Sequence, residues 1–555
     1  MVTMPGMQGI ELRAENGLLG IVQIQVDIKL ITEPGWAVVI GQLQRAAPGQ
    51  QHDKKNGNPS FHCNHTFRFK YPFKQALILS QIPLLSAKFR FLQNSLQKES
   101  IAMKTLDTRL AEHAATLKYE QLPAQAIEKA KIFILDSLGV GVAGGSVPET
   151  KSLFETIRHW GDGQSVSVWG QSHRLPMGQG IMMNAFQIHC QEFDCLHEGA
   201  VLHAMATLLP VLIAEAQVRG GVTGKQLITA VVAGVDVACY IGVASKLGLR
   251  FFRPATSGGF GAVAGLANLR GYDGHTTLQA LGHQLGQVSG TMQAHTEGSV
   301  VLPMQVAFNA RAAMQSCDLA HAGITGLQQP ITGKFGYLPM FESEWDLNKH
   351  IDGLGARWMI NELSHKPFPS GRATHGGIEG LMALRDAHRF GPDDVREVIV
   401  RGPSLINHLV NRPPMPNPGP NYARLCMPFA LAKVLQHGSP DLSHYRGDEL
   451  TDPRTYELSR RVRMEKDDNP DPNALSPQCV TVTLTDGSVL SHAIPSMLAS
   501  PSRPLDRERQ LRKFLRCWDF SAQPLGDPQA LVAQVDQLES LQDVTALVRL
   551  MSPKT

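Results

Sequence analysis

The densest group of chemically active side chains lies between His189 and His203, in the stretch HCQEFDCLHEGAVLH. Its ionisable residues are His189, Glu192, Asp194, His197, Glu198 and His203. Asp194 and His197 are three residues apart, so on a helix they would share a face. A carboxylate beside a histidine fixes the imidazole tautomer and supports its charged form, which suits acid–base catalysis. The alternative is a solvated loop whose histidines are incidental.

The same side chains are of the types that bind zinc. Their spacing, however, matches neither the HExxH motif nor a paired-cysteine site. We therefore predict that this segment holds no metal.

Two further stretches could hold an anionic ligand. In FRPATSGGFG (252–261), Arg253 precedes small residues, which let the backbone approach a ligand closely. Its guanidinium can bind a carboxylate through two hydrogen bonds. The alternative is a helix–helix contact with an exposed arginine. The segment KPFPSGRATH (366–375) carries cationic and imidazole groups. It lies where a helical pattern gives way to a mixed pattern of strands and helices, and clefts form at such domain boundaries. These groups are Lys366, Arg372 and His375. The alternative is a basic hinge.

The elements that must position these residues fall into three regions. Residues 103–362 show helical periodicity, for example Leu106, Leu110 and Ala114 on one face. Residues 363–498 mix types: 395–402 predicts a strand and 480–494 a hairpin that turns at Asp486-Gly487. Residues 499–555 return to helix, over 506–515 and 528–550. We predict a mostly α fold, a large all-α helical domain interrupted by a smaller α+β lid domain.

Residues 1–102 differ from the rest of the 555-residue chain. They hold 11 Lys and Arg against 6 Asp and Glu, whereas the remainder holds 41 against 43. Clean helical periodicity begins at Met103. We interpret 1–102 as an atypical N-terminal extension from a mis-called start; the alternative is an accessory segment.

The composition is that of a globular protein, with 43% hydrophobic and 18% charged residues and a net charge of +3. Such a charge gives no indication of nucleic-acid or membrane partners, and no long apolar run predicts a membrane span. The 8 cysteines are scattered without a CxxC pair, which favours reduced thiols in the cytoplasm.

Several motifs resemble the MmgE/PrpD family in their order along the chain: EFDCLHEGAVLH (192–203), FRPATSGGFGAVAG (252–265), GKFGYLPMF (333–341) and KPFPSGRATH (366–375). The resemblance covers about residues 103–520. It implies a helical domain and a smaller lid with the active site between them, and a homodimer. Activities of the family include 2-methylcitrate dehydration, cis-aconitate decarboxylation and epimerisation of an imino-dicarboxylate. The resemblance implies no cofactor.

The resemblance also assigns residues. It places Glu192 and Asp194 in the pocket, together with the family histidines at His197 and His203, the lysine at Lys366 and the histidine at His375. Four motifs of the pocket depart from the family pattern: Cys195-Leu196 replaces a carboxylate and a hydroxyl, Arg253 a histidine, and Phe429 a tyrosine, while the lysine expected after Gly298-Ser299 is missing.

We therefore predict a lyase that acts on a small di- or tricarboxylic acid and moves a proton at a carbon next to a carboxylate. A dehydratase is the first prediction and a decarboxylase the second. The predicted catalytic residues are Asp194, His197, His203 and Lys366. The predicted substrate-binding residues are Glu192, Arg253, Arg372 and His375. The alternatives are an epimerase or isomerase of a dicarboxylate, and a non-catalytic carboxylate-binding relative.

Overall fold

The computed structural model describes residues 24–33, 36–45, 65–72 and 105–553, and the chain divides into two compact units, 1–104 and 105–555. In the first unit, β1 (Ile24–Glu33), β2 (Trp36–Arg45) and β3 (His65–Pro72) form an antiparallel sheet in that order. The expectation that the chain properly starts at Met103 concerns residues outside the described ones.

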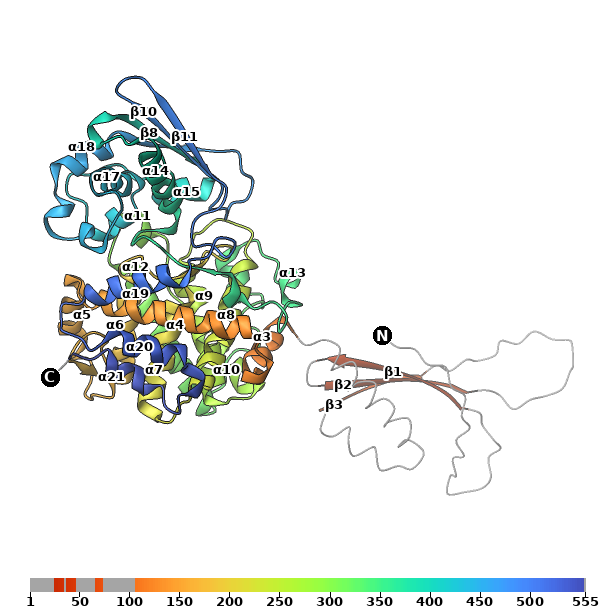
Figure 1. Ribbon diagram of the computed structural model, residues 1–555. Helices are drawn as coiled ribbons and strands as arrows, with labels where there is room; N and C mark the ends of the chain where they lie inside the picture. The colour runs from red at the N-terminus through yellow and green to blue at the C-terminus, as the bar shows by residue number, and fades with distance from the viewer. Residues whose placement is uncertain (1–23, 34–35, 46–64, 73–104, 554–555) are drawn as a thin grey trace, which may run out of the picture. The chain divides into compact units, whose positions relative to one another are not determined.

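The second unit begins with a helical part, which ends near residue 362 (Figure 1). Its main helices are α3 (Leu106–Thr116), α4 (Ala124–Gly144), α5 (Pro148–Ile157), α6 (Met177–His189), α7 (Ala204–Arg219), α8 (Gly224–Val243), α9 (Arg253–Arg270), α10 (Gly274–Leu285), α11 (Gln293–Glu297), α12 (Val301–His321) and α13 (Asn348–Ile351). Short strands β4 (Val166–Ser167), β5 (Arg174–Leu175) and β6 (Leu196–His197) lie between them. The predicted mostly α character is confirmed.

The centre of the helical part is the contact between α8 and α9. A Cβ atom on Gly261 would lie 2.5 Å from the carbonyl oxygen of Gly234, so only glycine allows the two backbones to approach this closely. By length and composition α8 could cross a membrane, with a mean hydropathy of 1.8, and this was not predicted from the sequence. Its apolar window is 89% buried, so packing inside the helical part accounts for its composition.

The sheet part follows, from the short strand β7 (Leu363–Ser364) onward, and Figure 1 shows it gathered on one side of the helical part. Its four-stranded sheet has the order β11-β10-β8-β9, in which only β8 and β9 run parallel. The strands are β8 (Val395–Gly402), β9 (Val462–Lys466), β10 (Gln478–Leu484) and β11 (Val489–Ile494), and the helices are α14 (His375–His388), α15 (Ser404–Val410), α16 (Pro420–Arg424), α17 (Met427–His437) and α18 (Pro453–Ser459).

The hairpin and the 395–402 strand were predicted correctly. At the turn between β10 and β11, Gly487 has φ +90°, and the Asp486 carboxylate accepts a hydrogen bond from the Ser488 backbone NH. These are the roles that the Asp-Gly pair plays in tight turns. The strand β9 was missed.

The chain ends in helices α19 (Arg507–Asp519), α20 (Pro528–Asp536) and α21 (Thr545–Leu550). The single helix predicted over 528–550 is wrong, because residues 541–544 leave the helix and their backbone bonds to the turn at 222–224 instead. Helix α19 packs on α4, where Lys513 pairs with Asp136 at 2.6 Å. Residues 105–555 form one compact unit, so the division into a helical domain and a lid stays a prediction.

Candidate active site

The loop between α6 and α7, residues 190–203, is almost wholly buried and carries the predicted site. It is not the helix that the Asp194–His197 spacing would require. Glu192 and Val201 instead adopt φ +49° and +50°, a left-handed conformation that is costly for residues other than glycine and that often accompanies functional sites. Strand β6, inside the loop, pairs with β7 of the sheet part.

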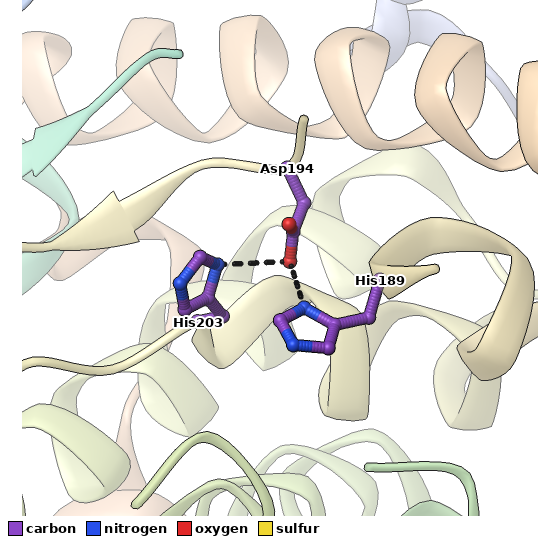
Figure 2. Close-up of side chains that lie close together, drawn as sticks. All are labelled: His189, Asp194 and His203. Atoms are coloured by element: carbon purple, nitrogen blue, oxygen red, sulfur yellow. Dashed lines mark hydrogen bonds and ion pairs between the residues drawn. The ribbon is translucent and has the colours of Figure 1, made fainter. Parts of the chain in front are cut away.

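Asp194 lies between two histidines (Figure 2). Its Oδ2 accepts hydrogen bonds from Nδ1 of His189, at the end of α6, at 2.9 Å, and from Nδ1 of His203, the residue before α7, at 3.0 Å. A carboxylate only accepts hydrogen bonds, so both Nδ1 atoms carry a proton. In each neutral imidazole, Nε2 is therefore left with a free electron pair that can accept a proton.

The two histidines differ in pKa. Burial lowers the pKa of His203 below its usual value, although the Asp194 charge opposes this. Burial also acts to lower the pKa of His189, but Asp194 and Glu192 outweigh it and raise that pKa. Burial acts to raise the pKa of Asp194, and the two histidines and Lys366 outweigh it and hold the pKa well below its usual range. Asp194 is thus ionised, and His203 is neutral at pH 7.

Lys366, from the segment that follows β7, completes this group. Its Nζ lies 2.8 Å from Oε2 of Glu192 and 3.8 Å from Oδ1 of Asp194, and its side chain is fully buried. Burial acts to raise the pKa of Glu192, but Lys366 and the two histidines lower it to about 2. A buried lysine thus binds two carboxylates that come from one loop.

A cavity of ≈ 60 Å³ lies against this group, between the helical part and the sheet part. Its walls include Glu192 and His203, the helical-part residues Leu196, Phe252 and His295, and the sheet-part residues Gly371, Arg372, Leu409, Val410 and Leu425. Leu196 replaces the hydroxyl that the family resemblance implies, so this part of the wall is apolar. Phe429 packs on Tyr445, with ring centres 5.6 Å apart, and does not line the cavity.

His295, on the short helix α11, meets a residue of the sheet part. Nη2 of Arg412 donates to Nδ1 of His295 at 3.2 Å and also to the His295 backbone carbonyl. Burial, and next the Arg412 charge, lower the pKa of His295 to about 3. No sequence motif surrounds either residue: His295 stands alone, and Arg412 begins a proline-rich loop.

His197 does not form the predicted pair with Asp194. It lies in β6, where Nδ1 accepts from the Ala200 backbone NH at 3.1 Å and Nε2 lies 3.3 Å from Oε2 of Glu362. It lines a second cavity, of ≈ 550 Å³, on another side of the loop. The reason is that Asp194 lies in the loop before β6 and His197 lies within β6, so the two residues do not share the helix face that their spacing suggested.

Arg253 is buried, and none of its nitrogens is left for a substrate. Its Nε and Nη2 bind Glu342, Nη2 also binds the Ser245 hydroxyl at 2.7 Å, and Nη1 is 3.4 Å from both the Ala200 carbonyl and the Asn473 side chain. The guanidinium joins the start of α9 to neighbouring segments. In this conformation Arg253 is engaged by the protein itself, and its predicted contact with substrate stays a prediction.

Arg372 and His375 lie side by side, but their polar atoms are occupied. Arg372 lines the first cavity while its guanidinium binds Glu198 at 2.8 Å and the Leu498 carbonyl at 2.8 Å. His375 is buried outside the cavity wall, with Nε2 on the Ser370 carbonyl at 3.1 Å. In this conformation Arg372 joins the sheet part to the 190–203 loop, whereas His375 bonds within the sheet part.

A metal ion could use the same atoms as the acid–base group. One ligand atom from each of His189, Asp194 and His203 lies within 4.8 Å of the others, and zinc accepts these ligand types. The two Nδ1 protons would have to leave first. Lys366 near Asp194 adds a positive charge that opposes a second cation there.

The structure therefore brings together Glu192, Asp194, His203 and Lys366 of the predicted residues. It adds His189, which the sequence motif contained, and His295 with Arg412, which it did not. The roles of all these residues in a reaction stay predictions.

Comparisons with known proteins identify relatives. The chain is 24% identical to cis-aconitate decarboxylase of Mus musculus over 463 residues, covering 78% of this chain and 91% of the relative. It is also 24% identical to the Homo sapiens enzyme of that name over 473 residues (81% and 95%), and to that of Aspergillus terreus over 479 residues (82% and 97%). Sequence models of the MmgE/PrpD N-terminal and C-terminal domains match residues 108–350 and 368–534. The chain belongs to the MmgE/PrpD family.

Proposed function

We propose that this protein is a lyase of a small di- or tricarboxylic acid, and that Nε2 of His203 moves a proton at a carbon next to a carboxylate. One observation carries the proposal: His203 lines the cavity while Asp194 holds its Nδ1. A histidine fixed in one tautomer by a buried carboxylate is well suited to general acid–base catalysis.

Loss of CO2 is the first reaction that we propose, since the relatives are named cis-aconitate decarboxylases. The bond to the departing carboxylate breaks, and its electron pair moves through the adjacent double bond toward a second carboxylate. The carbon beside that carboxylate then takes a proton from Nε2 of protonated His203. Solvent returns the proton, so the net reaction consumes one proton and releases CO2 and an acid with one carbon fewer.

Loss of water is the second candidate, and the pKa of His203 favours it. Because burial lowers that pKa, the resting imidazole is neutral and ready to take a proton. Nε2 of His203 would take the proton from the carbon beside a carboxylate, and the hydroxyl group on the neighbouring carbon would leave as water with a proton from solvent. The proton on His203 then returns to solvent, so the net reaction forms a double bond and one water molecule.

Charge supports an anionic substrate in both cases. Arg412 and Arg424, next to the cavity residues Val410 and Leu425, are buried and have no carboxylate partner within residues 105–553. An uncompensated buried cation is costly, so a bound anion would stabilise this arrangement.

The test uses the full chain and a panel of aconitate-, citrate- and tartrate-like acids in D2O, followed by mass spectrometry and proton NMR. We expect one acid to lose CO2 with deuterium entering the product; loss of water would select dehydration. His203→Ala should lose turnover, whereas a matched change at the exposed His159, His159→Ala, should keep it. A folded protein that converts no acid in the panel would contradict the proposal.

We also propose that the protein works in the cytoplasm. The 7 cysteines within the described residues are all free thiols, as expected in a reducing compartment. The homodimer implied by the family resemblance stays a prediction.

A further inference from the structure

His295 lines the same cavity as His203, but its surroundings give it the opposite hydrogen-bonding character. An arginine side chain only donates hydrogen bonds. The contact of 3.2 Å from Nη2 of Arg412 therefore makes Nδ1 of His295 an acceptor, and the ring proton lies on Nε2. In His203 the carboxylate of Asp194 places the proton on Nδ1 instead.

Nε2 is also the polar atom of His295 that remains for a ligand. Arg412 occupies Nδ1 and the backbone carbonyl, and no side-chain or backbone group of the described residues is bonded to Nε2. Nε2 of His295 is also not among the described side-chain atoms that are both fully buried and without a partner. Because it has no partner, it is therefore accessible from the cavity. Since His295 lines the cavity, Nε2–H is available to a molecule there.

The groups that face His295 keep it uncharged. Arg412 and His408 of the sheet part lower its pKa, Glu192 of the 190–203 loop raises it, and burial is the largest influence. With a pKa of about 3, the ring is neutral throughout the physiological range. It can therefore donate a hydrogen bond but is not an imidazolium that delivers a proton.

We propose that His295 is a neutral hydrogen-bond donor to the substrate, binding through Nε2–H the carboxylate oxygen on which negative charge develops, and that Arg412 is the positioning residue that selects this tautomer. The proposal rests on the proposed function and extends it, because both candidate reactions develop charge on the carboxylate next to the carbon that exchanges a proton. A donor fixed in advance at such an oxygen is an effective form of catalysis.

The two residues come from different parts of the fold. His295 belongs to α11 of the helical part, and Arg412 follows α15 in the sheet part (Figure 1). The contact that selects the donor tautomer therefore joins the helical part to the sheet part. Closure would complete the site at the moment when it excludes water.

The first test needs no substrate. The full chain is labelled with ¹⁵N-histidine, and the His295 signals are assigned by their loss in His295→Gln. We expect Nε2–H at neutral pH in the wild type, and in Arg412→Met a mixture of tautomers with a pKa that moves back toward 6.5. A charged His295, or one protonated on Nδ1 in the wild type, would overturn the proposal whatever the activity.

The second test compares turnover of the acid found in the panel. His295→Gln places an amide NH near the position of Nε2 and should keep most of kcat, whereas His295→Leu should lose roughly 10²–10³-fold, the usual loss for one such donor. His159→Leu, an exposed position, is the control. If His203→Ala is inactive and His295→Leu is fully active, the proposed function stands and this inference fails; if the wild type converts no acid, the proposed function fails and the NMR result alone decides the tautomer.

Discussion

Asp194 is the residue on which the acid–base group depends, because one of its oxygens binds both histidines. In Asp194→Asn, the negative charge that supports both imidazoles is lost. If the amide NH2 takes the place of Oδ2, it donates to Nδ1 and forces the ring proton onto Nε2; if the carbonyl takes that place, the NH2 faces the Lys366 ammonium instead. We expect kcat to fall by about 10³–10⁴-fold with the fold retained, as for other enzymes in which an Asp-to-Asn change imposes the wrong histidine tautomer. Steady-state kinetics and circular dichroism check this. Retained kcat would exclude Asp194 from the mechanism.

The pH profile tests the direction of proton transfer at His203. If the reaction is the decarboxylation, the active form is the protonated one, so kcat should rise as the pH falls from 7 toward the pKa of His203, which lies below 6.5. Glu192, with a pKa of about 2, stays ionised over this range. Rates measured from pH 5 to 8 decide it. A kcat that falls on acidification would instead assign His203 as the base of a dehydration.

Variants of Lys366 and Glu192 test how much the buried ion pair contributes to stability. Lys366→Met should destabilise the fold by about 3–5 kcal/mol, because it leaves buried carboxylates without their cation. The double variant Lys366→Met/Glu192→Gln should recover part of this loss. The pKa of Glu192 is lowered from 4.5 to about 2, so its stabilisation is complete above pH 4.5 and is lost as the pH falls toward 2. Urea unfolding at pH 7 and pH 3 measures both effects, and equal stability of wild type and Lys366→Met would contradict them.

At the residue scale, the sequence predicted which side chains lie together better than it predicted how they pair. Glu192, Asp194 and His203 were singled out because they crowd one motif, and Lys366 because it begins a cationic segment at a domain boundary; the family resemblance then placed all four in the pocket. The partner of Asp194 was wrong, since a helical spacing was assumed where the chain forms a loop with two left-handed residues. His295 and Arg412 are 117 positions apart, and no local pattern joins them.

At the element scale, a close backbone contact joins α8 to α9, the helix that begins at Arg253. Gly261→Ala should cost about 1–3 kcal/mol, because its methyl group would lie 2.5 Å from the Gly234 carbonyl oxygen. Gly248→Ala is the matched control: nothing lies within 4 Å of its added Cβ, and its φ is not positive, so it should change stability by less than about 0.5 kcal/mol. Equal unfolding midpoints in urea for the two variants would refute the tight contact.

Elements with a local signal were predicted well. At the start of α8, the Thr223 hydroxyl accepts a hydrogen bond from the Gln226 backbone NH, as a threonine N-cap does. The Asp486-Gly487 turn and the alternation around it gave the hairpin. By contrast β9, with the sequence VRMEK, and the two-residue strands β6 and β7 exist because of partners distant in sequence. Pairing with distant segments determines whether such strands form, so their own residues do not predict them.

At the scale of the whole molecule, the volume of the cavity beside His203 limits which molecules can enter it. Its ≈ 60 Å³ is well below the roughly 300–1,000 Å³ of ordinary small-molecule sites. A di- or tricarboxylic acid would therefore enter only if the helical and sheet parts separate. The contacts that would break and re-form include those of Arg412 with His295 and of Arg372 with Glu198.

The division of the chain at residue 104 leads to the last prediction. Residues 105–555 form a compact unit of their own, and the family match begins at residue 108. All the groups that we assign to the reaction lie inside that unit. A variant without residues 2–104 should therefore fold, keep its Tm within about 2 °C, on the order of 1 kcal/mol for a chain of this length, and convert the same acid with unchanged kcat. Calorimetry and the panel assay test this directly. If the shortened chain aggregates or loses turnover while the full chain is active, the first unit contributes to the fold or to the site, and its interpretation as a mis-called extension is wrong.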